Sequence, residues 1–96
     1  MLEELFSLDG HVALATRGNG GSGRAMALGL NAAGARVAVT GRDPHKNARM
    51  AAELGPDDAV YALDVRDEDA VNATIAALIT RFGQIDILVN NAGLFN

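Results

Sequence analysis

The sequence predicts a doubly wound α/β unit, with a parallel sheet of about four strands in the order 3-2-1-4 and about three helices on its faces. Short apolar runs alternate with longer amphipathic segments, Gly, Asp and Pro separate them, and a glycine cluster follows the first apolar run. Strands that alternate with helices require right-handed crossovers, and therefore a parallel sheet. With 96 residues, the chain is expected to form one domain spanning 1–96.

The first strand and the first helix flank the glycine cluster. Residues 12–16 are continuously apolar, which is typical of a central parallel strand that is buried on both faces. The helix after the glycines is expected to end at Gly34, because glycine is a frequent C-cap residue. Its packing stripe is predicted to consist of Ala25, Leu28, Gly29 and Ala32.

The alternation of strand and helix then repeats. Residues 36–40 form the second predicted strand, and Asp43 and Pro44 are suited to be the N-cap and the first residue of a helix. This second helix is expected to reach Leu54. A third strand over 59–65 follows it.

The third helix is expected to begin after Asp67 and to continue until Gly83. Its apolar residues recur at helical spacing, namely Val71, Ile75, Leu78, Ile79 and Phe82. Residues 85–89 are the fourth strand, which the order 3-2-1-4 leaves as an open apolar edge. Because only one helix would cover the second sheet face, we expect marginal stability and self-association through the fourth strand.

Composition excludes several classes of function. The net charge is -4 and the eight Lys and Arg are scattered, which argues against nucleic-acid binding and against a basic membrane-binding face. The absence of cysteine and the two distant histidines give no metal cluster, disulfide or thiol nucleophile. No apolar run approaches the roughly 18 residues of a membrane span, and the N-terminus is acidic. We therefore expect no signal peptide or membrane anchor, and a cytoplasmic location.

The glycine cluster is the first candidate binding site. Four glycines stand at positions 18, 20, 21 and 23, between the first strand and the first helix. In this context backbone N–H groups and the positive end of a helix receive the pyrophosphate of a dinucleotide, and glycine lets the backbone approach it. The alternative is a flexible turn, which would give four glycines no reason to be together.

Two registers of the glycine motif are possible, and other motifs choose between them. Residues 18–23 match G-x-G-x-x-G literally, whereas Thr16 to Gly23 is similar to the T-G-x-x-x-G-x-G motif of short-chain dehydrogenases. Leu8-Asp9-Gly10, Asp64-Val65 and Asn90-Asn91-Ala92-Gly93 also resemble hallmarks of that family at the expected separations. Nearly the whole chain resembles the cofactor-binding half of a short-chain dehydrogenase/reductase, of the glucose or gluconate dehydrogenase type or the 3-oxoacyl-carrier-protein reductase type.

The resemblance implies a Rossmann domain that binds NAD(P) and a longer parent oxidoreductase that transfers hydride between a carbonyl and an alcohol. The cofactor-binding residues that it implies are Arg17, Gly18, Asn19, Gly20, Gly21, Ser22, Gly23, Arg42, Asp64, Val65, Asn91 and Gly93. Asp64 and the Val65 backbone would hold the adenine, although Asp64 could instead cap a helix or be a solvated loop acid. Asn91 and Gly93 would border the nicotinamide-side ribose, and Asn90 would tie neighbouring strands; either Asn could instead be a turn former.

The end of the second strand bears on the choice of cofactor. An acid there accepts from the ribose 2′-OH of NAD, whereas a basic residue accommodates the 2′-phosphate of NADP. In the family register the acid would stand at Gly41, and Arg42 follows it. NADP is therefore favoured over NAD. The alternative is that Asp43 accepts from the hydroxyl, but we prefer Asp43 as a helix cap.

Two residues depart from the family pattern inside the expected site. Arg17 stands where the family has its first glycine, and Ser22 stands where an apolar residue is usual. A non-glycine residue in a strained turn costs about 1 to 3 kcal/mol, whereas a charged hydrogen bond to phosphate returns about 1.5 to 3 kcal/mol. Arg17 is either a phosphate clamp or an obstruction, with obstruction preferred, and Ser22 either caps the helix or removes an apolar contact with the cofactor.

No catalytic residues are expected in the chain. The family resemblance places a Tyr, a Lys four residues later and a Ser beyond the Asn90–Gly93 motif, whereas here Tyr61 precedes Val65 by four residues and Lys46 precedes both. The main hypothesis is the nucleotide-binding fragment of an NADP-preferring oxidoreductase that is inactive by itself. The alternatives are a non-catalytic nucleotide-binding or association module, and a decayed fragment without activity.

Overall fold

The computed structural model describes residues 7–17 and 19–91, which form one parallel sheet with three helices. The strand order is β3-β2-β1-β4, so the predicted fold class and strand order are confirmed. The strands are β1 (Val12–Thr16), β2 (Arg36–Gly41), β3 (Ala59–Ala62) and β4 (Ile87–Asn90). The helices are α2 (Gly21–Ala32), α3 (Pro44–Glu53) and α4 (Glu68–Phe82).

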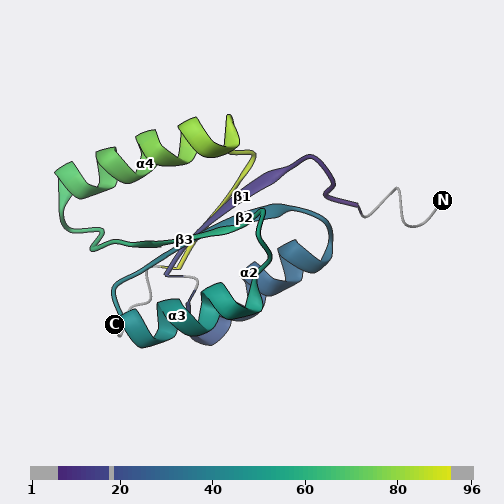
Figure 1. The fold of residues 1–96 in the computed structure, drawn as a ribbon, viewed down its shortest axis with the longest axis horizontal. Coiled ribbons are helices and arrows are strands. Elements are labelled where there is room, and N and C mark those ends of the chain that lie inside the picture. Colours follow the sequence, from purple (N-terminus) through teal and green to yellow (C-terminus); the bar gives the residue numbers. More distant parts are fainter. Residues whose placement is uncertain (1–6, 18, 92–96) are drawn as a thin grey trace.

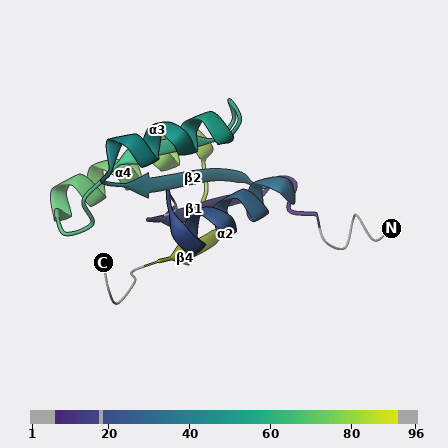
Figure 2. The same cartoon turned by 90° about the horizontal axis from the view of Figure 1, so that it is seen from below.

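The three helices are divided unequally between the faces of the sheet. Helices α2 and α3 lie on one face and α4 lies alone on the other, as Figures 1 and 2 show. Alternate residues of the central strands point to opposite faces. One core consists of Ala13, Ala15, Ala27, Ala35, Val37, Val39 and Met50, and the α4 core consists of Val12, Leu14, Ala38, Leu78 and Phe82. Both faces of β1 and β2 are therefore buried, which the continuous apolar run predicted for β1.

Of the four residues predicted for the packing stripe of helix α2, only Leu28 packs against the core. The buried residues of the helix are Gly23 and Ala27, whereas Ala25, Gly29 and Ala32 are exposed. The C-cap is Ala33, and Gly34 follows it with a φ of +109°. The left-handed backbone favours glycine at this position, and a Cβ there would require the Asp9 carboxylate to move.

The predicted caps of the other two helices are confirmed. Asp43 accepts hydrogen bonds from the backbone N–H groups of His45 (2.8 Å) and Lys46 (3.2 Å), and Pro44 begins α3. Asp67 accepts from the backbone N–H of Ala70 at 3.1 Å and begins α4. Aspartates are favourable at these positions because they satisfy N–H groups that the helix leaves free.

Strands β3 and β4 differ in extent from the prediction. Strand β3 ends at Ala62 because the Asp64 side chain accepts from the backbone N–H of Arg66 (3.0 Å) and closes a turn. Strand β4 begins later than predicted, at Ile87, and Asp86 precedes it with its carboxylate accepting from the backbone N–H of Val12 at 2.8 Å. Backbone hydrogen bonds continue one residue beyond each of these ends, from Leu63 to the Gly41 carbonyl and from Asp86 to the Val12 carbonyl.

A buried aspartate joins α2, β2 and the loop after α3. Asp58 is 9% exposed, and its carboxylate accepts from the backbone N–H of Val37 (2.8 Å), the backbone N–H of Gly55 (2.8 Å) and the side chain of Asn31 (3.0 Å). Its own carbonyl accepts from Arg81 of α4 at 2.8 Å. Because this carboxylate has donors on both oxygens, it is a structural link far from the glycine loop.

Candidate cofactor-binding site

A cleft of about 880 Å³ lies at the carboxyl ends of β1, β2 and β3. Open parallel sheets bind ligands at this position, and the volume suits a cofactor. The predicted site residues that line it are Arg17, Asn19, Gly20, Gly21, Ser22, Gly23, Arg42, Asp64, Val65 and Asn91. The lining also includes Thr40, Gly41, Asp43, Lys46, Leu63, Arg66 and Asn90. Gly18 and Gly93 lie outside the described residues.

The loop between β1 and α2 has the close backbone approach that its glycines suggested. Gly21 has a φ of +57°. A Cβ at Gly23 would lie 2.6 Å from the backbone oxygen of Arg17 and 2.7 Å from the side-chain nitrogen of Asn91. Arg17 has a φ of +57°, in the left-handed region that non-glycine residues rarely adopt. The departure from the family pattern at position 17 therefore falls where the backbone favours glycine.

The first turn of α2 faces the cleft without a side-chain cap. Its N-cap is Gly20, no side chain accepts a hydrogen bond there, and the first turn contains no acid. Ser22 does not cap the helix, so the alternative in which its hydroxyl caps α2 is wrong. The free N–H groups and the helix dipole give this end about half a positive charge. Helices α3 and α4 have aspartate caps, so among the described helices only α2 is open to an external anion.

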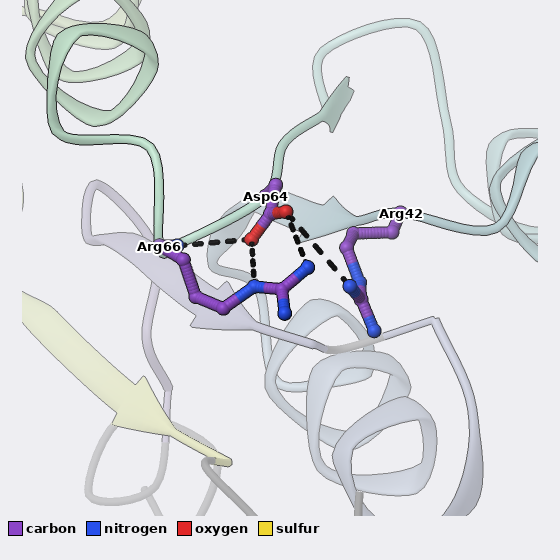
Figure 3. A network of polar contacts seen from close by, with 3 residues as sticks. All are labelled: Arg42, Asp64 and Arg66. Atoms are coloured by element: carbon purple, nitrogen blue, oxygen red, sulfur yellow. Dashed lines mark hydrogen bonds and ion pairs between the residues drawn. The ribbon is translucent and has the colours of Figure 1, made fainter.

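Asp64 is held between two arginines at the edge of the cleft. Its carboxylate accepts from Nε (3.0 Å) and Nη2 (2.9 Å) of Arg66, and Nη1 of Arg42 lies 3.8 Å from Oδ2, as Figure 3 shows. The Arg66 hydrogen bonds, with the nearby charges of Arg66 and Arg42, hold the pKa of Asp64 well below its usual range. Asp64 is therefore a carboxylate at neutral pH. It does not cap α4, a function that Asp67 has.

Basic side chains exceed free acids around the cleft. Arg17, Arg42, Lys46 and Arg66 line it, and the two aspartates among the lining residues already accept hydrogen bonds. The backbone N–H groups of Lys46 and His45 lower the pKa of Asp43, which therefore remains ionised as the cap of α3. Sequence reasoning missed Lys46 and Arg66. Lys46 stands three residues after the Asp43 cap, and its place in the first turn of α3 was the available signal.

Asparagine and threonine side chains connect β1 and β4 beside the cleft. The hydroxyl of Thr16 donates to the side-chain oxygen of Asn90 at 3.1 Å, so Asn90 ties neighbouring strands as predicted. The backbone N–H of Asn91 donates to the same hydroxyl at 3.3 Å. The buried side-chain nitrogen of Asn91 and the buried hydroxyl of Thr40 find no hydrogen-bond partner within the described part of the chain. Both residues line the cleft, so a ligand could satisfy these groups.

The chain's single tyrosine lies away from the cleft. Tyr61 is on β3 and packs against the core beneath α4, and it is not among the residues that line the cleft. Within residues 7–17 and 19–91, no cluster of three His, Cys, Asp or Glu side chains is arranged to hold a metal ion. None of the described helices has the length and apolar character needed to cross a membrane.

Comparison with known proteins gives the family of the chain. Residues 11–96 match the family model described as short chain dehydrogenase. A sorbitol dehydrogenase from Cereibacter sphaeroides is 45% identical over 89 residues, which are 93% of this chain and 35% of that protein. A gluconate 5-dehydrogenase from Gluconobacter oxydans is 42% identical, over 95% of this chain and 37% of that protein.

Solved structures agree with the sequence comparison. The crystal structure of 2-keto-3-deoxy-D-gluconate dehydrogenase from Streptococcus agalactiae superposes with a TM-score of 0.86 at 35% identity, covering 99% of this chain and 37% of that one. The chain belongs to the short-chain dehydrogenase family, whose members bind NAD(P), and it corresponds to the dinucleotide-binding part of the fold. The chain spans 35% of the length of the sorbitol dehydrogenase.

Proposed function

We propose that the chain, as one domain over 1–96, is the NAD(P)-binding portion of an oxidoreductase that interconverts a carbonyl and an alcohol. The observation that carries the proposal is the uncapped first turn of α2, which faces a cleft lined by Arg17, Arg42, Lys46 and Arg66. A helix end without a cap and a surplus of cations together favour a polyanionic ligand. The cofactor supplies the hydride chemistry, and the protein supplies binding and orientation.

Each part of the dinucleotide has candidate partners in the cleft. Backbone N–H groups of Gly21 and Ser22 are available for the pyrophosphate, with Arg17 beside them. Asp64 and the Val65 backbone are assigned to the adenine. Because Arg66 already binds both oxygens of Asp64, an adenine amino group must share that carboxylate or displace Arg66.

The remaining assignments concern the nicotinamide side. We assign Asn91 and Gly93 to the nicotinamide-side ribose. In support of Asn91, its side-chain nitrogen is buried, lines the cleft and finds no acceptor among the described residues. Asn19 and Gly20 to Gly23 complete the loop that would surround the phosphates, and Gly18 belongs to the same assignment by its place in the motif.

We propose a preference for NADP over NAD. The Asp43 carboxylate caps α3 through Oδ1, which supports its assignment as a helix cap over the alternative in which it accepts from a ribose hydroxyl. Arg42 lies next to Gly41 at the cleft, where the ribose 2′ position of a dinucleotide is expected. A guanidinium at this place supports recognition of a 2′-phosphate.

Catalysis is assigned to a longer protein. Tyr61 and Lys46 do not form a proton-transfer pair, since Tyr61 packs beneath α4 and Lys46 lines the cleft. The identities of 45% to a sorbitol dehydrogenase and 42% to a gluconate 5-dehydrogenase support a parent that acts on polyols or sugar acids. The cytoplasmic location expected from the sequence stays a prediction.

A second candidate function is an association module. Leu88 is 63% exposed on β4, which is an edge strand of the sheet. An edge strand has backbone groups that can pair with another chain, so β4, with 4 residues, supports self-association or pairing with a relative.

Titration calorimetry with NADPH and NADH tests the proposed function. We expect the 96-residue chain to bind NADPH with a micromolar dissociation constant, to bind NADH about tenfold more weakly, and to show no turnover. Gly23→Ala, which places a Cβ 2.6 Å from the Arg17 carbonyl, should abolish both interactions. Absence of binding to either dinucleotide would contradict the proposal, and turnover by the chain would contradict the assignment of catalysis elsewhere.

A further inference from the structure

Two asparagine side chains form an amide bridge across the end of β2. Asn19 comes from the loop before α2, and its side-chain nitrogen donates to the side-chain oxygen of Asn47 in α3 at 2.8 Å. The side-chain nitrogen of Asn47 donates to the backbone oxygen of Gly41 at 2.9 Å. Asn19 is 8% exposed, so its amide is held in place and is largely inaccessible to water. The bridge therefore joins the glycine loop, β2 and α3.

The bridge occupies the space that a side chain at position 41 would need. A Cβ at Gly41 would lie 2.6 Å from Cγ of Asn19 and 2.7 Å from the side-chain oxygen of Asn47, and still closer to the side-chain nitrogen of Asn19. Gly41 does not need glycine for a left-handed backbone, because its φ is not positive. A side chain at position 41 would require both asparagine side chains to move, which would break the bridge.

We propose that the Asn19–Asn47 bridge determines cofactor selectivity, because it excludes from position 41 the carboxylate that would accept from the ribose 2′-OH of NAD. This inference rests on the proposed NADP preference and assigns its structural cause. Arg42 follows Gly41, and the Asp64 carboxylate lies 3.8 Å from its guanidinium, on the rim of the cleft. The bridge thus leaves no room for an acidic side chain at position 41, while the basic Arg42 stands at the same end of β2.

Lys46 supplies a second cation at this end of the cleft. A Cβ at Gly20 would lie 3.5 Å from Cδ and 3.6 Å from Nζ of Lys46, so the Lys46 side chain lies against the glycine loop. Lys46 and Asn47 are neighbours in the first turn of α3, which the Asp43 cap fixes. One helix end therefore carries both the amide that closes position 41 and an ammonium group for the 2′-phosphate. Together, the amide bridge excludes a carboxylate that would accept from the ribose 2′-OH of NAD, and the ammonium group favours the 2′-phosphate of NADP.

The test compares Gly41→Asp alone with Gly41→Asp combined with Asn19→Ala. In the single variant, the new carboxylate is forced out of position or breaks the bridge, so NADPH binding falls and NADH binding does not improve. In the double variant, the bridge is broken and the Asn47 side chain, which no longer accepts the Asn19 hydrogen bond, can turn away from position 41. NADH binding should therefore be at least about tenfold tighter than in the single variant. Gly29→Asp is the charge control, since a Cβ at Gly29 meets no atom within 4 Å and the residue is exposed.

The outcomes separate this inference from the proposed function. If the unchanged chain binds neither dinucleotide, the proposed function fails and selectivity has no basis. If it prefers NADPH and Gly41→Asp alone gains NADH affinity within about twofold of the double variant, the bridge does not control selectivity although the proposed function stands.

A measurement without cofactor keeps the inference testable for variants that bind weakly. Hydrogen exchange of the Asn19 and Asn47 side-chain amides, followed by NMR in the unliganded chain, should be slowed in the unchanged protein. Gly41→Ala should abolish that protection because its Cβ displaces the bridge. Unchanged protection in Gly41→Ala would show that position 41 tolerates a side chain, and would overturn the inference.

Discussion

Replacing Arg17 by glycine should stabilise the chain. Arg17 has a φ of +57°, and a left-handed non-glycine residue costs about 1 to 2 kcal/mol. Glycine removes that cost but loses about 0.5 to 1 kcal/mol through the greater freedom of the unfolded chain. The net stabilisation is therefore about 0.5 to 1 kcal/mol. For a domain of this size it corresponds to a rise of about 3 to 6 °C in the unfolding midpoint.

Thermal unfolding followed by far-UV circular dichroism checks this prediction. Arg17→Ala is the matched control, because it removes the guanidinium but leaves a Cβ in the left-handed conformation. We expect the control to change stability by less than about 0.5 kcal/mol. If the alanine and glycine variants raise the midpoint equally, the charge of Arg17 destabilises the chain and the backbone reasoning is wrong. A lower midpoint in Arg17→Gly would refute it as well.

Three further predictions concern the described contacts. Asp58→Ala should destabilise the chain by about 2 to 4 kcal/mol in urea unfolding, because it leaves the backbone N–H of Val37 and other buried donors unpaired; a loss below about 1 kcal/mol would contradict this. The pKa of Asp86 is lowered mainly by the backbone N–H of Val12, so its stabilisation is complete above the unfolded pKa of about 3.9 and is lost as pH falls through the lower folded pKa. Asp86→Asn should therefore reduce the decrease of the unfolding midpoint with falling pH below about pH 4. An unchanged slope would show that Asp86 does not contribute to the loss of stability in acid. Leu88→Lys should reduce self-association in sedimentation velocity, since Leu88 is 63% exposed on an edge strand; equal association of both proteins would place the contact elsewhere.

The sequence predicted the order of elements because each boundary carried a local chemical signal. Asp43 and Asp67 are strong N-cap residues, and both cap helices in the structure. The continuous apolar run of β1 distinguished a strand buried on both faces from one exposed on one face. Once the glycines followed a parallel strand, the carboxyl edge of the sheet was the expected place for a ligand, and the described site residues line a cleft there.

Other features depend on contacts between distant residues and left no periodic signal. Three of the four residues predicted for the α2 stripe were wrong because alanine and glycine give little hydrophobic contrast. Gly23 is buried by its approach to the Arg17 carbonyl. Lys46 reaches the cleft from the first turn of α3 and Arg66 from the turn before α4, and hydrophobic periodicity does not predict where such long charged side chains lie. The Asn19–Asn47 bridge joins the loop before α2 to helix α3 and could be recognised only after the fold was known.

The segment before β1 is fastened to the end of α2 that is remote from the cleft. The backbone N–H of Leu8 donates to the Ala33 carbonyl at 2.8 Å, and the Asp9 carboxylate occupies the space beside Gly34. Strand β1, with 5 residues, separates this junction from the glycine loop by about 16 Å. Because the chain has no cysteine and His11 is exposed, His11→Cys would create a unique thiol at this junction. A fluorophore or surface tether attached there would leave the nucleotide entrance unobstructed.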